Sequence, residues 1–260
     1  MFVDLPIFLI ASLAINIGMF MVAYPLQTDK LTDISYAATF VILSFFGLFT
    51  FGATPINLLV TAMITMWAAR LGIFLFIRIN KTGRDPRFDS IRSSTWKFGK
   101  FWLAQGLSVW TILLGAEILF YNQMNVWNWL TAVGAVVWFA GFFIESLADI
   151  QKFRFSQDSD NKNKWIDHGL WHYSRHPNYL GEMLVWLGLY LVVFPNLTQS
   201  EAVVALISPL YIIVLLLFVS GVPPLEKIAN ERWENNKKYQ TYKERTSILL
   251  LLPPKKEHKK

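Results

Sequence analysis

Apolar residues along this chain form long runs separated by short polar segments. Seven runs are close to the length that crosses the hydrocarbon core of a bilayer, about 20 residues. They cover residues 5–26, 34–52, 56–79, 98–120, 127–147, 178–195 and 203–221. A soluble domain does not repeat membrane-length runs so often. The pattern predicts an all-α integral membrane protein with seven transmembrane helices, organised as a single membrane domain over residues 1–260.

Positive charge is confined to alternate connections between these runs. The segments after the third and fifth runs and the C-terminal tail carry most of the Lys and Arg, whereas 53–55, 121–126 and 196–202 carry none. Because basic loops stay in the cytoplasm, this asymmetry predicts an outside N-terminus and a cytoplasmic C-terminus, in the inner membrane if the protein is bacterial. The first run lacks a basic leader and a small-residue cleavage site, so we interpret it as a retained span.

The C-terminal tail changes character after the last run. Residues 223–245 begin with a proline pair and are too charged to cross a membrane, which predicts one cytoplasmic amphipathic helix. Its apolar members, among them Trp233 and Tyr242, are expected to lie against the bundle or the lipid headgroups. The run 248–252 is too short to span, so it is expected to rest in the interface or to cap the bundle.

Composition removes several classes of chemistry. The chain is 54% hydrophobic and has no cysteine, which excludes disulfides, thiolate metal sites and cysteine nucleophiles. The formal net charge is +6, but the basic residues lie where membrane topology requires them, so nucleic acid is not an expected partner. The lipid bilayer is an expected partner. No pattern in the chain specifies an oligomeric state.

The stretch W-I-D-H-G-L-W-H-Y-S-R-H-P-N-Y-L-G-E-M-L-V-W at 165–186 turns from a polar loop into an apolar run. Pro177 suits the first turn of a helix, so a helix is predicted to begin there. Asn178 and Glu182 then lie four residues apart on one helix face. A carboxylate one turn into an apolar helix is costly unless it has a partner or faces a cavity. Glu182 is therefore the first functional candidate.

Charged groups gather around this predicted helix start. A helix N-terminus with cations beside it forms a receptor for phosphate. The neighbouring candidates are Glu145, Asp149, Lys152, Arg154, Arg175 and His176. The alternative is that these basic side chains only snorkel to the interface beside an aromatic belt, which would not require Asn178 and Glu182.

Three histidines precede the helix at a spacing of four residues. His168, His172 and His176 would share a face only if the segment were helical, and Gly169 and Pro177 favour a loop. We interpret them as hydrogen-bonding or cofactor-contacting groups and predict no metal site.

Two further arginines are candidates. Arg70 lies inside the third run, where an arginine normally faces the bundle interior and pairs with a carboxylate, either for function or as a structural ion pair. Arg84 belongs to R-I-N-K-T-G-R-D-P-R-F-D-S-I-R at 78–92, which would grip phosphates or serve only as a positive-inside anchor. The chain has no Walker loop and no G-x-G-x-x-G, so soluble nucleotide-binding folds are unsupported.

The segment G-L-W-H-Y-S-R-H-P-N-Y-L-G-E at 169–182 resembles the steroid 5α-reductase superfamily, most closely its broad bacterial branch. Supporting stretches are W-A-A-R-L, G-R-D-P-R, A-D-I-Q-K-F-R-F and the closing L-E-K…E-R-W…Y-Q-T-Y-K-E-R-T-S-I-L-L-L-L-P, which together cover about residues 67–253. R-H-P-x-Y-x-G also resembles isoprenylcysteine carboxyl methyltransferases, which bind S-adenosylmethionine. Their E-E pair and F-G-x-x-Y pattern are replaced here by Leu225-Glu226 and Trp233-Glu234, closer to the reductases.

The reductase resemblance implies that NADPH is the cofactor and that an activated carbon–carbon double bond in a lipophilic small molecule is reduced. The residues that it matches to cofactor contacts are Asn178, Glu182, Asp149, Arg70 and Arg84. On grounds of charge or position we add Lys152, Arg154, Arg175 and His176. The candidates for the catalytic acid are Glu182, Tyr179 and Tyr173.

The substrate side departs from that family. Steroid reductases carry a Gln-Glu pair in the second helix and a tyrosine one turn before the third-helix arginine. Here the second run has no acidic residue, and Trp67 stands at the tyrosine position. Cofactor binding therefore carries over better than steroid specificity. The alternatives are a methyltransferase that uses S-adenosylmethionine on a lipid or prenylated thiol, and a non-enzymatic membrane scaffold.

Overall fold

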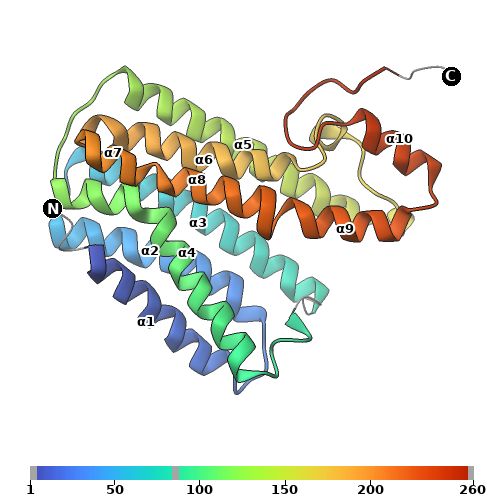
Figure 1. Ribbon diagram of the computed structural model, residues 1–260, viewed down its shortest axis with the longest axis horizontal. Coiled ribbons are helices and arrows are strands. Elements are labelled where there is room, and N and C mark those ends of the chain that lie inside the picture. The colour runs from blue at the N-terminus through green and yellow to red at the C-terminus, as the bar shows by residue number, and fades with distance from the viewer. Residues whose placement is uncertain (1–4, 84–87, 257–260) are drawn as a thin grey trace. The chain divides into compact units, whose positions relative to one another are not determined.

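The computed structural model describes residues 5–83 and 88–256, which form helices joined by short loops, with one isolated β-bridge between Ser174 and Ser247 (Figure 1). Seven helical segments within these residues are long and apolar enough to cross a membrane. The prediction of an all-α, multi-pass membrane protein is confirmed.

The helices follow the apolar runs closely. The first six are α1 (Leu5–Ala23), α2 (Lys30–Phe51), α3 (Pro55–Thr82), α4 (Thr95–Asn122), α5 (Trp129–Gln157) and α6 (Pro177–Val193). The seventh segment is divided into α7 (Gln199–Ala205), α8 (Ile207–Val214), a π-helical turn (Leu215–Val219) and α9 (Val222–Trp233), and α10 (Lys237–Arg245) follows. Pro209 has no N–H to donate to the Ala205 carbonyl, which accounts for the break between α7 and α8.

Two boundaries differ from the sequence prediction and one agrees. α6 begins at Pro177, as predicted. α5 continues to Gln157, so that Lys152 lies on a helix and not in a loop. The single helix predicted over 223–245 is wrong, because the chain forms α9 and α10. Asn236 separates them: its side chain accepts hydrogen bonds from the backbone N–H groups of Lys238 and Tyr239 in the first turn of α10.

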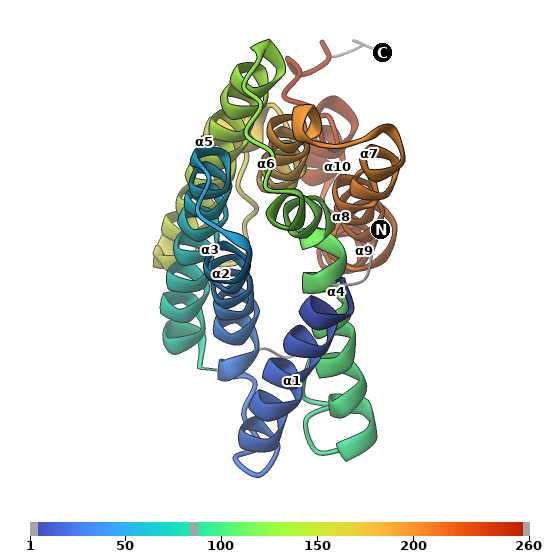
Figure 2. The ribbon, with the colours of Figure 1, turned by 90° about the vertical axis from the view of Figure 1, so that its left-hand side faces the viewer.

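The chain divides into two compact units. The first comprises Met1–Ala132 and Leu189–Ser208. Within it α2 packs along α3, and α1 packs along α4 (Figure 2). Gln105 Nε2 donates to Asn16 Oδ1 at 2.8 Å, and Ser12 Oγ donates to the Gly106 carbonyl at 2.8 Å. These hydrogen bonds satisfy polar side chains that are buried among apolar helices.

The second unit comprises Val133–Gly188 and Pro209–Lys260 and contains nearly all of α5, most of α6, and α9 and α10. Glycines bring α5 and α6 into close contact. A Cβ atom added at Gly181 would lie 2.6 Å from the Glu145 Cβ and 2.7 Å from the Gly141 carbonyl oxygen. Only a residue without a side chain permits this approach, which is typical of helix pairs in membranes. The contact fixes the register of the start of α6 against the end of α5.

Candidate cofactor-binding site

The glycine contact sets Asn178 against Asp149. One turn before Gly181 on α6, the Asn178 side chain donates from Nδ2 to Asp149 Oδ1 at 3.2 Å. Asp149 is only 8% exposed, and Asn178 is half-buried. A buried carboxylate needs such a donor, because an unpaired charge is costly away from water. The structure thus joins two residues that are 29 positions apart and that the sequence resemblance matched to cofactor contacts.

The two principal acid candidates also lie on the first turns of α6. Tyr179 and Glu182 are both half-buried. The Tyr179 ring stacks on the His176 ring, with centroids 5.5 Å apart and planes at 5°. Tyr173, the third candidate, is 42% exposed. Tyr179 and Glu182 are therefore better sheltered from solvent than Tyr173.

A carboxylate from α9 compensates the positive charge just before α6. Glu226 forms an ion pair with Arg175, and its Oε1 lies 2.9 Å from His176 Nε2. All three side chains are largely buried. Burial lowers the pKa of His176 below its ordinary value, and the hydrogen bond to Glu226 opposes that change. The group is a compact polar cluster that ties α9 to the start of α6.

The end of the chain is bound to the same loop. The Arg175 backbone N–H donates to the Ser247 carbonyl at 2.8 Å, and Ser174 Oγ donates to the Leu249 carbonyl at 2.7 Å. The Tyr242 hydroxyl donates to the Trp171 carbonyl at 2.9 Å. α10 and the residues after it therefore hold the polar loop before α6 in place.

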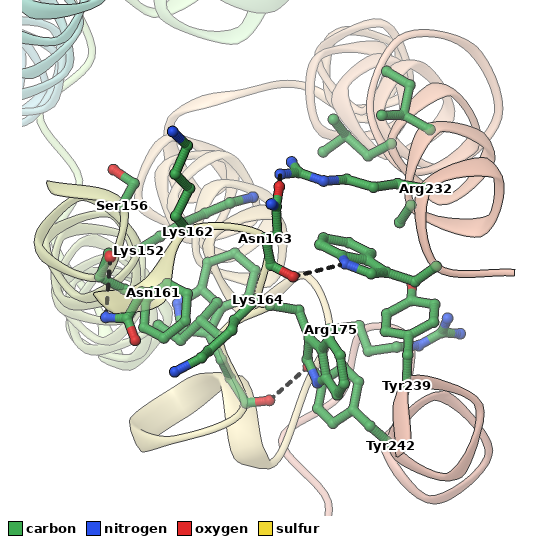
Figure 3. Close-up of a pocket in the computed structure, with 18 of the residues that line it drawn as sticks. Lys152, Ser156, Asn161, Lys162, Asn163, Lys164, Arg175, Arg232, Tyr239 and Tyr242 are labelled. Atoms are coloured by element: carbon green, nitrogen blue, oxygen red, sulfur yellow. Dashed lines mark hydrogen bonds between the residues drawn. The ribbon is translucent and has the colours of Figure 1, made fainter. Parts of the chain in front are cut away.

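A cavity of about 670 Å³ opens between this loop, the end of α5, and α9 and α10 (Figure 3). Its basic residues are Lys152, Lys162, Lys164, Arg175 and Arg232. Its acidic residues are Asp158 and Glu226. Its aromatic residues, apart from His176, are Phe155, Trp165, Trp171, Trp233, Tyr239 and Tyr242. The volume is that of a site for a small organic molecule, and the lining suits an anion with flat rings.

The structure distributes the predicted site residues unevenly. Lys152, Arg175 and His176 line the cavity. Four others do not line the cavity. Asp149 lies on α5, and Asn178, Tyr179 and Glu182 lie on α6, shortly after Arg175 and His176 in the sequence. Arg154 is exposed and does not line the cavity.

The remaining predictions lie elsewhere in the chain. Arg70 is half-buried on α3 in the first unit, and Arg84 lies outside the described residues. His168 and His172 are exposed whereas His176 is buried, so the three do not form one face. The described residues contain no cluster of three or more His, Asp or Glu side chains that would hold a metal ion.

Sequence reasoning did not assign the cavity residues of the tail to the site. Glu226, Ala229 and Trp233 recur at helical spacing along α9, and all three line the cavity. That periodicity was a usable signal, because residues three and four apart share one helix face. Tyr239 and Tyr242 on α10 repeat it. The sequence alone predicts a packing surface on this face, and the structure shows that the same face also lines the cavity.

Comparisons with known proteins identify a family. The family model described as "Protein of unknown function (DUF1295)" matches residues 19–246 and so includes the α5–α6 contact, α9 and α10. No curated protein and no solved structure matches the chain. The match covers well over half of the sequence, and the chain therefore belongs to the DUF1295 family of proteins of unknown function.

Proposed function

We propose that this protein is a membrane-embedded reductase that takes NADPH from the cytoplasmic side and reduces an activated carbon–carbon double bond in a lipophilic substrate, either steroid-like or another enone. The observation that carries the proposal is the cavity. It combines positive charge with aromatic faces and reaches Arg175 and His176, which precede Asn178 by three and two residues. The resemblance of 169–182 to the steroid 5α-reductase superfamily supports the same cofactor.

Charge separates this proposal from methyl transfer. The lining has five Lys or Arg residues and two carboxylates, so it is net positive even with His176 neutral. NADPH carries a pyrophosphate and a 2′-phosphate, whereas S-adenosylmethionine carries a sulfonium, an ammonium and a carboxylate group, is net positive and has no phosphate. A cationic cavity attracts the first molecule and repels the second. The electrostatics therefore favour NADPH.

The chain's own residues would orient the cofactor and move a proton. When bound, NADPH supplies a hydride to the β-carbon of the enone. Asn178, held by Asp149, and Glu182 one turn further would position the nicotinamide. Negative charge that develops on the substrate oxygen needs a donor nearby, and Tyr179 and Glu182 are half-buried candidates on the same helix. Apolar helices around them would exclude water.

A binding experiment tests the cofactor first. Purified, detergent-solubilised full-length protein is titrated with NADPH, NADH and S-adenosylmethionine while its thermal unfolding is followed. A ligand at about a hundredfold excess over its dissociation constant stabilises the folded state by about 2.7 kcal/mol. We expect NADPH to stabilise the protein and S-adenosylmethionine to have no effect. Asn178→Ala and Glu182→Gln should weaken the NADPH response, and Glu244→Gln on the exposed side of α10 is the matched control.

Activity is tested with the same protein. NADPH oxidation is followed at its absorbance maximum while a panel of lipophilic enones is added, with matched saturated ketones as controls. Consumption that depends on the enone and is lost in Glu182→Gln supports the reductase. Stabilisation by S-adenosylmethionine alone would replace the proposal with methyl transfer, and no response to any of the ligands would favour a scaffold.

A further inference from the structure

One wall of the cavity, called the outer wall here, is formed by Lys162, Asn163, Arg232 and Trp233 and carries an arginine that has a hydrogen-bond partner. Arg232, near the end of α9, donates from Nη2 to Asn163 Oδ1 at 2.8 Å, and the indole of Trp233 donates to the Asn163 carbonyl at 3.2 Å (Figure 3). Asn163 has a positive φ of 65°, a conformation that Asn adopts more readily than most residues. The loop therefore presents this asparagine to two successive side chains of α9. The Arg232 guanidinium lies at the solvent-exposed side of the cavity and makes this hydrogen bond with the loop.

The charge at this wall is not neutralised. The partner of Arg232 is a neutral amide, and no carboxylate within 5–83 and 88–256 forms an ion pair with Arg232 or with Lys162, which precedes Asn163 in the sequence and also lines the cavity. Asp158 also lines the cavity, but its oxygens accept from the Asp160 backbone N–H and from Asn161 Nδ2. Arg175 differs, because Glu226 already compensates its charge. The outer wall therefore carries the positive charge that is least compensated by carboxylates, and an anion is expected to bind at this end of the cavity.

The two ends are separated along α9. Glu226 contacts Arg175 and His176 at the inner end, and Arg232 follows six residues later. At 1.5 Å per residue this places them about 9 Å apart along the helix axis. If the nicotinamide lies near Asn178, as the proposed function requires, the adenosine half of an extended dinucleotide reaches the outer end. Trp165 and Trp233 provide flat apolar rings there, and the Arg232 guanidinium lies 5.1 Å from the Trp233 ring centroid.

We propose, on the basis of that function, that Arg232 together with Lys162 binds the 2′-phosphate of NADPH and makes the protein select NADPH over NADH. A guanidinium presents a planar fork of donors that matches a phosphate monoester, and Lys162 adds a second positive charge. NADH lacks this phosphate and leaves both cations without an anionic partner. Arg232 and Lys162 are thus specificity residues and take no part in proton transfer.

The test measures cofactor preference in the full-length detergent-solubilised protein. Dissociation constants for NADPH and NADH are determined for the wild type, Arg232→Gln, Lys162→Gln and the control Lys227→Gln. Lys227 lies on the same helix, is exposed and does not line the cavity. We expect Arg232→Gln to weaken NADPH binding about tenfold or more, the scale of one lost hydrogen bond to a charged group, and to leave NADH binding unchanged. Lys162→Gln should act in the same direction, and Lys227→Gln should change neither constant.

A second probe isolates the phosphate from the nicotinamide. 2′,5′-ADP should compete with NADPH in the wild type, whereas 5′-AMP, which lacks the 2′-phosphate, should compete much less. This difference should disappear in Arg232→Gln. A preference for NADPH that survives in Arg232→Gln, or an equal loss of NADPH and NADH binding, would overturn the assignment and leave the proposed function standing. Failure of the wild type to bind either nicotinamide cofactor would refute the proposed function itself.

Discussion

Replacing Gly181 by alanine tests whether the α5–α6 contact builds the site. The added methyl would meet the Glu145 Cβ at 2.6 Å and the Gly141 carbonyl oxygen at 2.7 Å, where ordinary contacts begin at 3.4 Å. Two of the three nearest atoms are backbone, so the clash cannot be relieved by turning a side chain. The helices must move apart by most of an ångström. The Asn178–Asp149 hydrogen bond, already 3.2 Å long, would then stretch beyond useful length.

The magnitude follows from two opposing terms. Overpacking of a close contact costs about 1–3 kcal/mol. Alanine in place of glycine inside a helix regains up to about 1 kcal/mol through its higher helix propensity. We therefore expect Gly181→Ala to lower the free energy of unfolding by about 1–2 kcal/mol. The loss of the Asn178 position should also weaken NADPH binding more than the stability change alone explains.

The assay is thermal unfolding in detergent with and without NADPH, and Gly18→Ala is the matched control. Gly18 lies on α1, and a Cβ atom added there meets nothing within 4 Å. This control should be neutral or slightly stabilising. If Gly181→Ala unfolds at the wild-type temperature and binds NADPH normally, the helices do not meet as closely as the structure shows. The positioning of Asn178 by that contact would then be refuted.

Two further predictions concern the polar loop before α6. Burial holds the pKa of His176 below the ordinary value of about 6.5, so as pH falls below about 6.5 the unfolded chain takes up a proton that the folded chain does not. Stability should fall from pH 7 to pH 5.5, and His176→Gln should flatten this slope in thermal unfolding; parallel slopes would contradict the assignment. Tyr242→Phe removes the hydroxyl that donates to the Trp171 carbonyl and should lower the free energy of unfolding by about 0.5–1.5 kcal/mol in a denaturant titration. An unchanged midpoint would mean that water replaces this bond without loss.

Hydropathy predicted the number of membrane helices but not where each helix ends. The apolar run ends at residue 147, whereas α5 continues to Gln157. Residues 148–157 contain charged side chains but no glycine or proline, so nothing in them ends a helix. A change from apolar to polar residues marks a change of solvent. Helix ends require their own chemical cause, such as Pro177 at the start of α6.

The pairing of Asn178 with Asp149 depended on a contact between helices that composition does not reveal. Glycines at 134 and 141 on α5 and at 181 and 188 on α6 are each seven residues apart, two helical turns. Such a repeat predicts a close helix contact, but it does not say which helix is the partner. The tail presented the same difficulty. Glu226 pairs with Arg175 only because α9 packs against the loop before α6. A single sequence does not show such a long-range contact.

Which cations are available to a phosphate depends on their partners and not on their number. Sequence reasoning placed Arg175 among the phosphate contacts because it precedes a helix N-terminus. In the fold its guanidinium is paired with Glu226, so a phosphate at Arg175 would have to displace a carboxylate that is also bound to His176. At Arg232 a phosphate would displace only a neutral amide oxygen, which costs far less. An anionic cofactor is therefore expected to gain most of its charge interaction at the outer wall, and the inner cluster mainly positions α6.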